Sequence, residues 1–239
     1  MELSNVKKYD MKYFFVVLVL LAGTIFQCLL FLFSNEKADI DAISKYSVVE
    51  VKAETDEVGE SFGTAVFVKK DGTLITNAHV VSYKKLGEYQ AFDKISIRFS
   101  TEDDYRDVSL IKYDNEKDLA VLKLNNLNCK YKPIKFGSAD KLKFGDKVFA
   151  LGNLNNVGIS LTEGIISNPK INVTYNEIQR EVIQCDLTIA EGNSGGALVN
   201  SKGELIGITT FRLKDSSNNV IYGISYSIMS NAVLEYIKN

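Results

Sequence analysis

Residues 191–196 read Glu-Gly-Asn-Ser-Gly-Gly, and the rest of this 239-residue chain is best interpreted outward from that stretch. Glycine lets a chain turn where a Cβ would clash, so Ser194 is expected to stand exposed on a tight turn. The backbone N–H groups of Gly192 and Ser194 can then point into one concavity, as an oxyanion hole requires. A serine between glycines also occurs in ordinary surface turns, so the stretch alone leaves a simple turn equally open.

Two other residues decide between these interpretations. His79, the only histidine in the chain, follows the apolar run at residues 74–78, and Asp118 opens the apolar run at residues 119–122. Taken singly, a lone histidine is most often a hydrogen-bonded structural residue, and an acid beside a strand is often a turn residue. Taken together, the chain order His79, Asp118, Ser194 is that of a chymotrypsin-like triad, whereas subtilisin-like enzymes and α/β-hydrolases use other orders.

Five blocks of sequence carry a resemblance to a known family. Residues 76–81, 118–123 and 192–200 resemble the signature blocks of the HtrA/Deg group of trypsin-like serine proteases, and residues 203–208 and 222–228 resemble the strands that follow. The similarity covers roughly residues 45 to 235. It implies a serine endopeptidase in which Ser194 attacks the peptide carbonyl, His79 acts as general base and Asp118 orients the imidazole.

The resemblance also implies an oxyanion hole and a specificity pocket. The oxyanion hole would comprise Gly192, Asn193 and Ser194. Thr188 would lie near the pocket base, where the absence of an acid argues against a Lys or Arg preference and favours a small or medium aliphatic residue. The substrate-binding residues expected in this way are Thr188, Thr210, Phe211 and Ser225, of which Thr210 would also support the triad acid.

Members of this group usually carry PDZ domains after the protease. Such a domain needs about 90 residues, and only residues 229–239 follow the last strand pattern, so none is expected within this sequence. The group also implies a homotrimer, which no residue of this sequence indicates by itself. The implied partners are polypeptides, chiefly unfolded or envelope proteins.

The N-terminal segment predicts a membrane anchor. Residues 14–33 contain no charged side chain, and 20 helical residues span roughly 30 Å, the thickness of a bilayer core. Lysines precede the run at residues 7, 8 and 12, and acids follow it, so residues 1–13 are expected in the cytoplasm and the protease domain outside the cell membrane. A cleaved signal peptide is the alternative, although the run exceeds a signal core and lacks a small-x-small exit.

Composition excludes several other functions. The chain has 28 basic and 30 acidic residues and a net charge of −2, which argues against nucleic acid as a partner. Cys129 and Cys185 allow at most one disulfide outside the anchor, so the fold must depend on its core. One histidine and no close cysteine pair argue against a zinc site, and neither a metal nor a cofactor is expected.

Short apolar or alternating runs divided by turn signals predict an all-β fold of two six-stranded antiparallel barrels of the chymotrypsin type. After a stalk at residues 34–45, a protease domain is expected over residues 46–239, with one barrel over 46–124 and the other over 147–228. The expected strands are 46–54, 61–69, 72–77, 93–99, 105–113, 118–124, 147–152, 158–167, 180–186, 197–200, 204–212 and 220–228. Apolar residues at helical spacing predict a closing helix over residues 229–238.

The leading functional hypothesis is a membrane-anchored serine endopeptidase that acts on misfolded or regulatory proteins outside the cytoplasm. Its triad would assemble across the cleft between the barrels. A catalytically silent, chaperone-like binding module on the same fold is the alternative from another class. A serine esterase is a third hypothesis, disfavoured by the His-Asp-Ser order.

Overall fold

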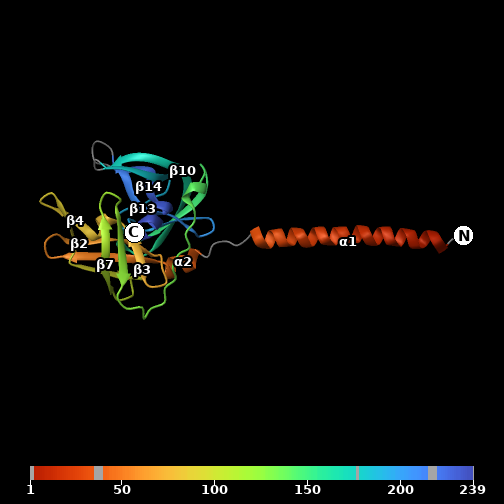
Figure 1. Ribbon diagram of the computed structural model, residues 1–239, viewed down its shortest axis with the longest axis horizontal. Coiled ribbons are helices and arrows are strands. Elements are labelled where there is room, and N and C mark those ends of the chain that lie inside the picture. Colours follow the sequence, from red (N-terminus) through yellow and green to blue (C-terminus); the bar gives the residue numbers. More distant parts are fainter. Residues whose placement is uncertain (1–2, 35–39, 176–177, 215–219, 239) are drawn as a thin grey trace. The chain divides into compact units, whose positions relative to one another are not determined.

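The computed structural model describes residues 3–34, 40–175, 178–214 and 220–238 (Figure 1). The chain divides into two compact units, Met1–Ala38 and Asp39–Asn239. The described residues of the first unit form the helix α1 (Leu3–Ser34). The second unit contains every predicted site residue.

The membrane span predicted at residues 14–33 is not supported by the structure. In α1 the side chains from Lys12 to Cys28 are exposed. Within the described residues, no helix combines the length and the hydropathy that a membrane crossing demands. The stalk predicted at residues 34–45 overlaps the short helix α2 (Ile40–Tyr46), and residues 35–39 lie outside the described residues.

Six antiparallel strands close the first barrel in the order β1-β2-β3-β8-β7-β6. In a closed barrel each strand turns one face inward, and the buried side chains inside this barrel are apolar. Between β3 and β6 the chain forms the one-turn helix α3 (Ala78–Val81). The strands are β1 (Val48–Thr55), β2 (Gly59–Phe67), β3 (Thr73–Thr76), β6 (Lys94–Arg98), β7 (Arg106–Asp114) and β8 (Leu119–Leu124).

Six further strands close a second barrel in the order β10-β11-β14-β13-β12-β9. The chain reaches it through a connector that contains the short 3₁₀ helix η1 (Ala139–Lys141), and a second one, η2 (Leu154–Asn156), follows β9. The strands are β9 (Lys147–Gly152), β10 (Ser160–Tyr175), β11 (Ile178–Cys185), β12 (Ala197–Asn200), β13 (Leu205–Lys214) and β14 (Val220–Met229). The mostly β, chymotrypsin-like fold predicted from the sequence is therefore confirmed.

The core has a layer inside each barrel and a third layer between them. Phe67 and Leu122 belong to the first barrel's interior, and Ile183 and Leu198 to the second's. The layer between the barrels joins side chains from both, including Ile75 and Leu119 from the first and Leu151 and Val199 from the second. Full burial of such a side chain contributes about 1.5–3 kcal/mol, so this shared layer holds the two barrels together.

The predicted closing helix is α4 (Ser230–Lys238), which is confirmed. Its Val233 and Tyr236 pack into the layer between the barrels. Lys112 of β7 donates to the Tyr236 carbonyl at 2.6 Å, and its ammonium lies 4.4 Å from the Tyr236 ring centroid. The helix therefore fastens the C-terminal end of the chain to the first barrel.

Two strand features were not expected from the sequence. A hairpin of β4 (Ser82–Lys85) and β5 (Glu88–Ala91) stands beside the first barrel, with its turn at Leu86 (φ 52°) and Gly87 (φ 92°). Its polar, largely exposed side chains give no alternation by which to recognise it.

Strand β10 continues to Tyr175, well beyond the predicted end at residue 167. Pro169 suggests a break, but the pairing with β11 shifts register between Asn168 and Ile171, so the proline sits in an irregularity where no ladder hydrogen bond is required. Its partner β11 begins at Ile178, two residues before the predicted start at residue 180, and carries Arg180.

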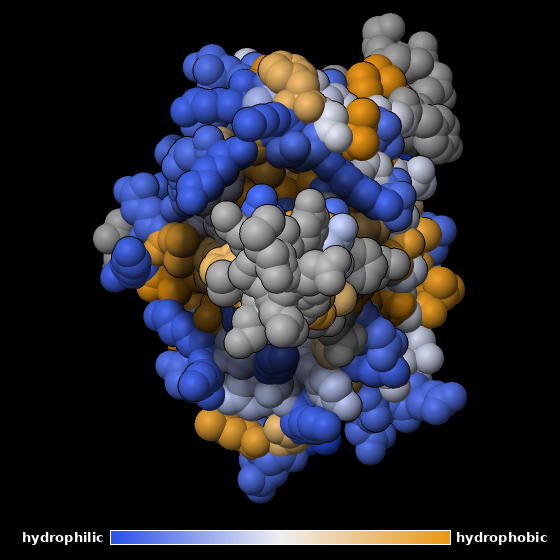
Figure 2. Space-filling view, turned by 90° about the vertical axis from the view of Figure 1, so that its right-hand side faces the viewer, coloured by the Kyte–Doolittle hydropathy of each residue, from blue (hydrophilic) through white to orange (hydrophobic). Residues whose placement is uncertain are grey.

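The face drawn in Figure 2 carries mainly hydrophilic side chains with scattered apolar ones among them. All three cysteines are free, Cys185 buried inside the second barrel and Cys129 half-buried, so no disulfide supports the fold.

Candidate functional site

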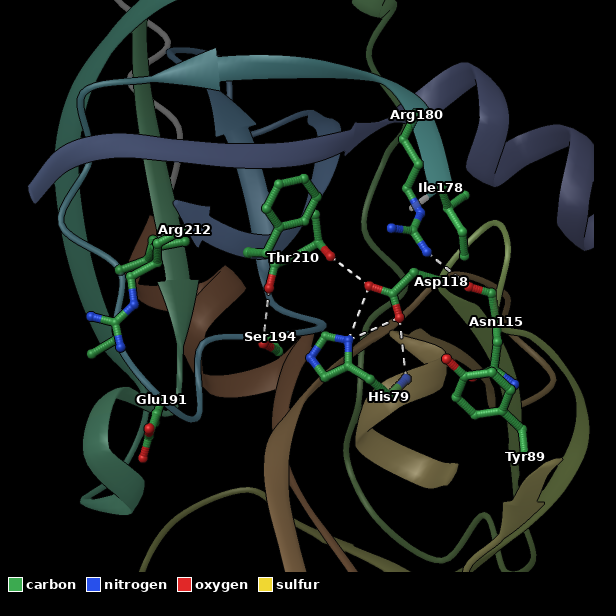
Figure 3. A pocket seen from close by; sticks show the side chains of 13 residues that line it. His79, Tyr89, Asn115, Asp118, Ile178, Arg180, Glu191, Ser194, Thr210 and Arg212 are labelled. Atoms are coloured by element: carbon green, nitrogen blue, oxygen red, sulfur yellow. Dashed lines mark hydrogen bonds and ion pairs between the residues drawn. The ribbon is translucent and has the colours of Figure 1, made fainter. Parts of the chain in front are cut away.

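His79 and Asp118 form a hydrogen-bonded pair (Figure 3). The one-turn helix α3 carries His79, and Asp118 immediately precedes β8. The imidazole Nδ1 lies 2.8 Å from Asp118 Oδ1 and 3.0 Å from Oδ2. The backbone N–H of His79 also donates to Oδ1, at 3.1 Å. Asp118 therefore fixes both the ring and the backbone of His79, which leaves Nε2 as the nitrogen available for chemistry.

Asp118 is itself held from several sides. The Thr210 hydroxyl donates to Asp118 Oδ2 at 2.5 Å, and the Asn77 side-chain amide donates to the Asp118 carbonyl at 2.8 Å. Asp118 has a left-handed backbone conformation, with φ of 53°. Such a conformation is uncommon for a residue other than glycine and costs about 1–3 kcal/mol, so the surrounding hydrogen bonds must outweigh the strain.

The electrostatics of the pair follow from this geometry. Burial alone would raise the pKa of Asp118, but the attraction of His79 and the hydrogen bonds from His79 and Thr210 outweigh it and hold the pKa below its ordinary value. Burial alone would lower the pKa of His79, but the Asp118 carboxylate reverses this and raises the pKa above its ordinary value of 6.5. The imidazole is nonetheless accessible, with 47% of its side-chain surface exposed.

Ser194 lies on the tight turn that the glycines predict. Gly192 (φ 90°) and Gly195 (φ 84°) both have left-handed conformations. A Cβ at Gly192 would collide with the Asn153 carbonyl, and one at Gly195 with the Thr64 carbonyl. The Ser194 hydroxyl donates to the Thr210 carbonyl at 3.0 Å, and within the described residues it makes no hydrogen bond to His79.

The three residues predicted for the oxyanion hole differ in whether their backbone N–H groups already donate a hydrogen bond. Within the described residues, the N–H groups of Gly192 and Ser194 have no acceptor, whereas the Asn193 N–H donates to the Ala190 carbonyl at 3.2 Å. The Asn193 N–H is therefore already engaged. The two free N–H groups are those that a negatively charged oxygen beside Ser194 would require.

Hydrogen bonds across the two barrels hold this turn. The Thr64 hydroxyl of β2 donates to the Gly192 carbonyl at 2.7 Å and accepts from the Asn153 N–H at 2.8 Å. The Asn153 side chain donates to buried Glu50 Oε2 at 3.2 Å, and Arg98 pairs with the same oxygen at 2.9 Å. The first barrel thus sets the orientation of the peptide that precedes Asn193.

A cavity of about 300 Å³ contains the site. His79, Asp118 and Ser194 all line it, together with Thr210 and Phe211 from β13. Of the four residues predicted to bind substrate, Thr210 and Phe211 are therefore at the cavity. Thr188 is exposed and Ser225 is buried with its hydroxyl on the Cys185 carbonyl at 3.3 Å, and neither lines the cavity.

Several lining residues were missed from the sequence. Ile189, Ala190 and Glu191 line the cavity where Thr188 was expected. Tyr89 comes from the unexpected hairpin, and Ile178 and Arg180 lie at the start of β11. No local pattern distinguishes them from other strand residues. The full set not predicted is Tyr89, Asn115, Ile178, Arg180, Ile189, Ala190, Glu191 and Arg212.

The chain belongs to the family of trypsin-like peptidase domains. The model of that family matches residues 63–208, a range that contains His79, Asp118 and Ser194. The resemblance to the HtrA/Deg group is also confirmed. The serine endoprotease DegS of Haemophilus influenzae is 36% identical over 181 residues, covering 74% of this chain and 50% of the relative. The periplasmic serine endoprotease DegP of Escherichia coli is 35% identical over 176 residues, covering 72% and 34%.

Solved structures agree with these relatives. The HtrA-type protease AlgW with tripeptide superimposes with a TM-score of 0.70 at 31% identity, covering 83% of this chain and 62% of that one. The chain spans half or less of the length of the two curated relatives named here.

Proposed function

We propose that this chain is a serine endopeptidase that cleaves polypeptides through His79, Asp118 and Ser194. The observation that carries the proposal is the Asp118 carboxylate holding His79 Nδ1 at 2.8 Å in the same cavity as Ser194. A buried acid on one ring nitrogen fixes the tautomer whose other nitrogen accepts a proton. The serine endoproteases among its relatives make peptide bonds the expected substrate.

Each residue has a role that its contacts support. Ser194 Oγ attacks the peptide carbonyl, and His79 takes the hydroxyl proton and then delivers it to the leaving amine. Asp118, supported by Thr210, stabilises the imidazolium that forms. The N–H groups of Gly192 and Ser194 bind the oxyanion. The Ser194 hydroxyl must first turn from the Thr210 carbonyl to His79, a rotation about one side-chain bond.

Covalent labelling and proteolysis test this proposal together. The purified full-length chain is treated with a fluorophosphonate, which reacts with an activated serine, and is then incubated with an unfolded protein. Labelling of Ser194 and endoproteolytic fragments are expected, with activity retained in a chelator. Labelling without fragments would favour a serine esterase. A chain that neither labels nor cleaves would favour the non-catalytic binding module.

The rate of cleavage should depend on pH through the protonation of His79. His79 must be neutral to accept a proton, so kcat/KM should rise as the pH passes upward through the His79 pKa. Since Asp118 raises that pKa, the midpoint should lie above 6.5. Initial rates between about pH 5 and pH 9 measure the midpoint. His79 is the only histidine, so His79→Gln should remove the titration with the activity. A midpoint well below 6.5 would contradict the pairing.

We also propose that the peptidase unit acts outside the cytoplasm and is anchored by the N-terminal segment. The named periplasmic relative supports the first part. The uncharged run at residues 14–33, with lysines at positions 7, 8 and 12 before it, supports the second. Alkaline carbonate should then fail to extract the intact chain from membranes, and protease added to spheroplasts should digest the peptidase unit.

Two outcomes would revise this placement. A soluble form that begins near residues 34–40 would indicate a cleaved signal peptide. Protection of the peptidase unit from added protease would reverse the topology.

A further inference from the structure

Two arginines line the cavity that contains Ser194. Arg180 and Arg212 lie at its wall, and the acids there are Asp118 and Glu191. Asp118 is already engaged by His79 and Thr210. Within the part of the chain that the structure describes, neither arginine forms an ion pair with a carboxylate, whereas Arg98 elsewhere pairs with Glu50 at 2.9 Å. Neither guanidinium at this wall is therefore paired directly with a carboxylate of the described residues.

Arg180 is held in place by backbone carbonyls. Its Nε donates to the Glu116 carbonyl at 2.8 Å, and one terminal nitrogen, Nη2, donates to the Asn115 carbonyl at 2.8 Å. The other terminal nitrogen, Nη1, has no acceptor among the described residues. Carbonyl acceptors fix the guanidinium without cancelling its charge. A ligand that binds Nη1 would thus meet a donor that is already ordered, which reduces the entropic cost of binding.

The surroundings favour Arg180 over Arg212 as a binding residue. Figure 3 shows Arg180 and Ile178 descending from β11 toward Asp118 and Asn115, whereas Arg212 and Glu191 lie together on the Ser194 side. Glu191 offers Arg212 a nearby opposite charge. The charge of Arg180 reaches the reacting groups, since it acts to lower the pKa of His79 against the effect of Asp118. Ile178 and Tyr89 add apolar wall for the methylenes of an acidic side chain.

Bracing of the two barrels is the simpler role for Arg180. Its two hydrogen bonds do join β11 of the second barrel to the segment after β7 of the first. Bracing, however, needs neither an uncancelled charge nor an unused donor facing the cavity. A guanidinium with a free N–H is well suited to a carboxylate, which it binds by a charge-assisted hydrogen bond.

We propose that Arg180 binds a carboxylate side chain of the substrate, so that the enzyme prefers polypeptides with Asp or Glu within a few residues of the cleaved bond. This inference rests on the proposed endopeptidase function. It makes Arg180 a specificity-determining residue, and it defines the substrate class as segments that bring an acidic side chain beside the scissile peptide.

Paired peptides test the inference on the unaltered full-length chain. Each pair differs only by Glu against Gln at one position, and the position is scanned across four residues on either side of the cleaved bond. The kcat/KM is measured at a pH above the His79 titration. At one position, Glu should be favoured about five- to tenfold, and the preference should shrink as salt rises from about 0.05 M to about 0.5 M. Equal rates at every position would overturn the inference.

Charge variants assign the preference to Arg180. Arg180→Gln should bring the Glu and Gln peptides to equal kcat/KM, and Arg180→Glu should favour Lys over Glu at the same position. The matched control is Arg106→Gln, an exposed arginine of β7 away from the cavity, which should keep the preference. A preference that survives in Arg180→Gln, or is lost in Arg212→Gln instead, would overturn the assignment.

Fluorophosphonate labelling separates this inference from the proposed function. If Ser194 labels and peptides are cut without any preference for acid, only the role of Arg180 fails. If Ser194 neither labels nor cuts, the endopeptidase function fails and the inference fails with it. The comparison in unaltered protein needs no variant, so a structural effect of Arg180→Gln on the segment at Asn115 cannot decide the result.

Discussion

Ser194→Ala is expected to lower kcat by about 10⁴–10⁶ while leaving the fold intact, because the members of a nucleophilic triad act as a unit. Among the described residues the hydroxyl makes one hydrogen bond, to the Thr210 carbonyl at 3.0 Å, and the turn is shaped by Gly192 and Gly195. Loss of Oγ should therefore remove the nucleophile and little else. The measurements are kcat on an unfolded protein, fluorophosphonate labelling and the thermal unfolding midpoint.

Ser201→Ala is the matched control for this change. Ser201 is exposed, lies outside the cavity and also donates to a backbone carbonyl, that of Lys147 at 3.4 Å. Its replacement should change neither labelling nor kcat. Near-normal proteolysis by Ser194→Ala would remove Ser194 as the nucleophile, and an equal loss in Ser201→Ala would show that the assay reports on stability.

Asp118→Asn is expected to cost about 10⁴ in kcat. The carboxylate now accepts from the His79 ring, the His79 backbone and Thr210. An amide in its place presents an NH₂ group where an acceptor is needed and favours the wrong imidazole tautomer. It also removes the charge that raises the His79 pKa, so any residual activity should titrate at lower pH. A pH profile of kcat on a peptide substrate measures both effects.

Asp114→Asn provides the comparison. Asp114 accepts from the backbone N–H groups of Glu116 and Lys117, at 3.0 and 2.9 Å, and from the Lys117 ammonium at 2.8 Å. It orders the same turn but does not bond to His79. Asp114→Asn should leave the pH dependence of kcat unchanged. A damaging Asp114→Asn beside a harmless Asp118→Asn would mean that the acid of the triad is misassigned.

Most of the strands could be predicted from the sequence. Alternating or apolar runs are local patterns, and β1, β8, β9 and β12 lie within two residues of the predicted ranges. His79, Asp118 and Ser194 could also be selected from the sequence, because their chain order is that of a chymotrypsin-like triad, and the structure brings all three to one cavity. Local patterns did not reveal the β4–β5 hairpin, whose side chains are mostly polar and exposed. They also placed the end of β10 too early, because Pro169 suggested a break within a strand that continues to Tyr175.

The construction of the cavity depends on contacts that form between the two barrels. The hydrogen bonds from Thr64 to Gly192 and from Asn153 to Glu50 join residues 128 and 103 positions apart, and no local periodicity encodes such pairs. The hydrogen bonds of Arg180 also cross between the barrels, because its acceptors lie on the first barrel. Thr188 and Ser225 were assigned by position along the chain, yet they lie away from the cavity. Hydrophobic alternation fixes which face of a strand is buried, but the polar contacts between barrels arise only when the two barrels pack.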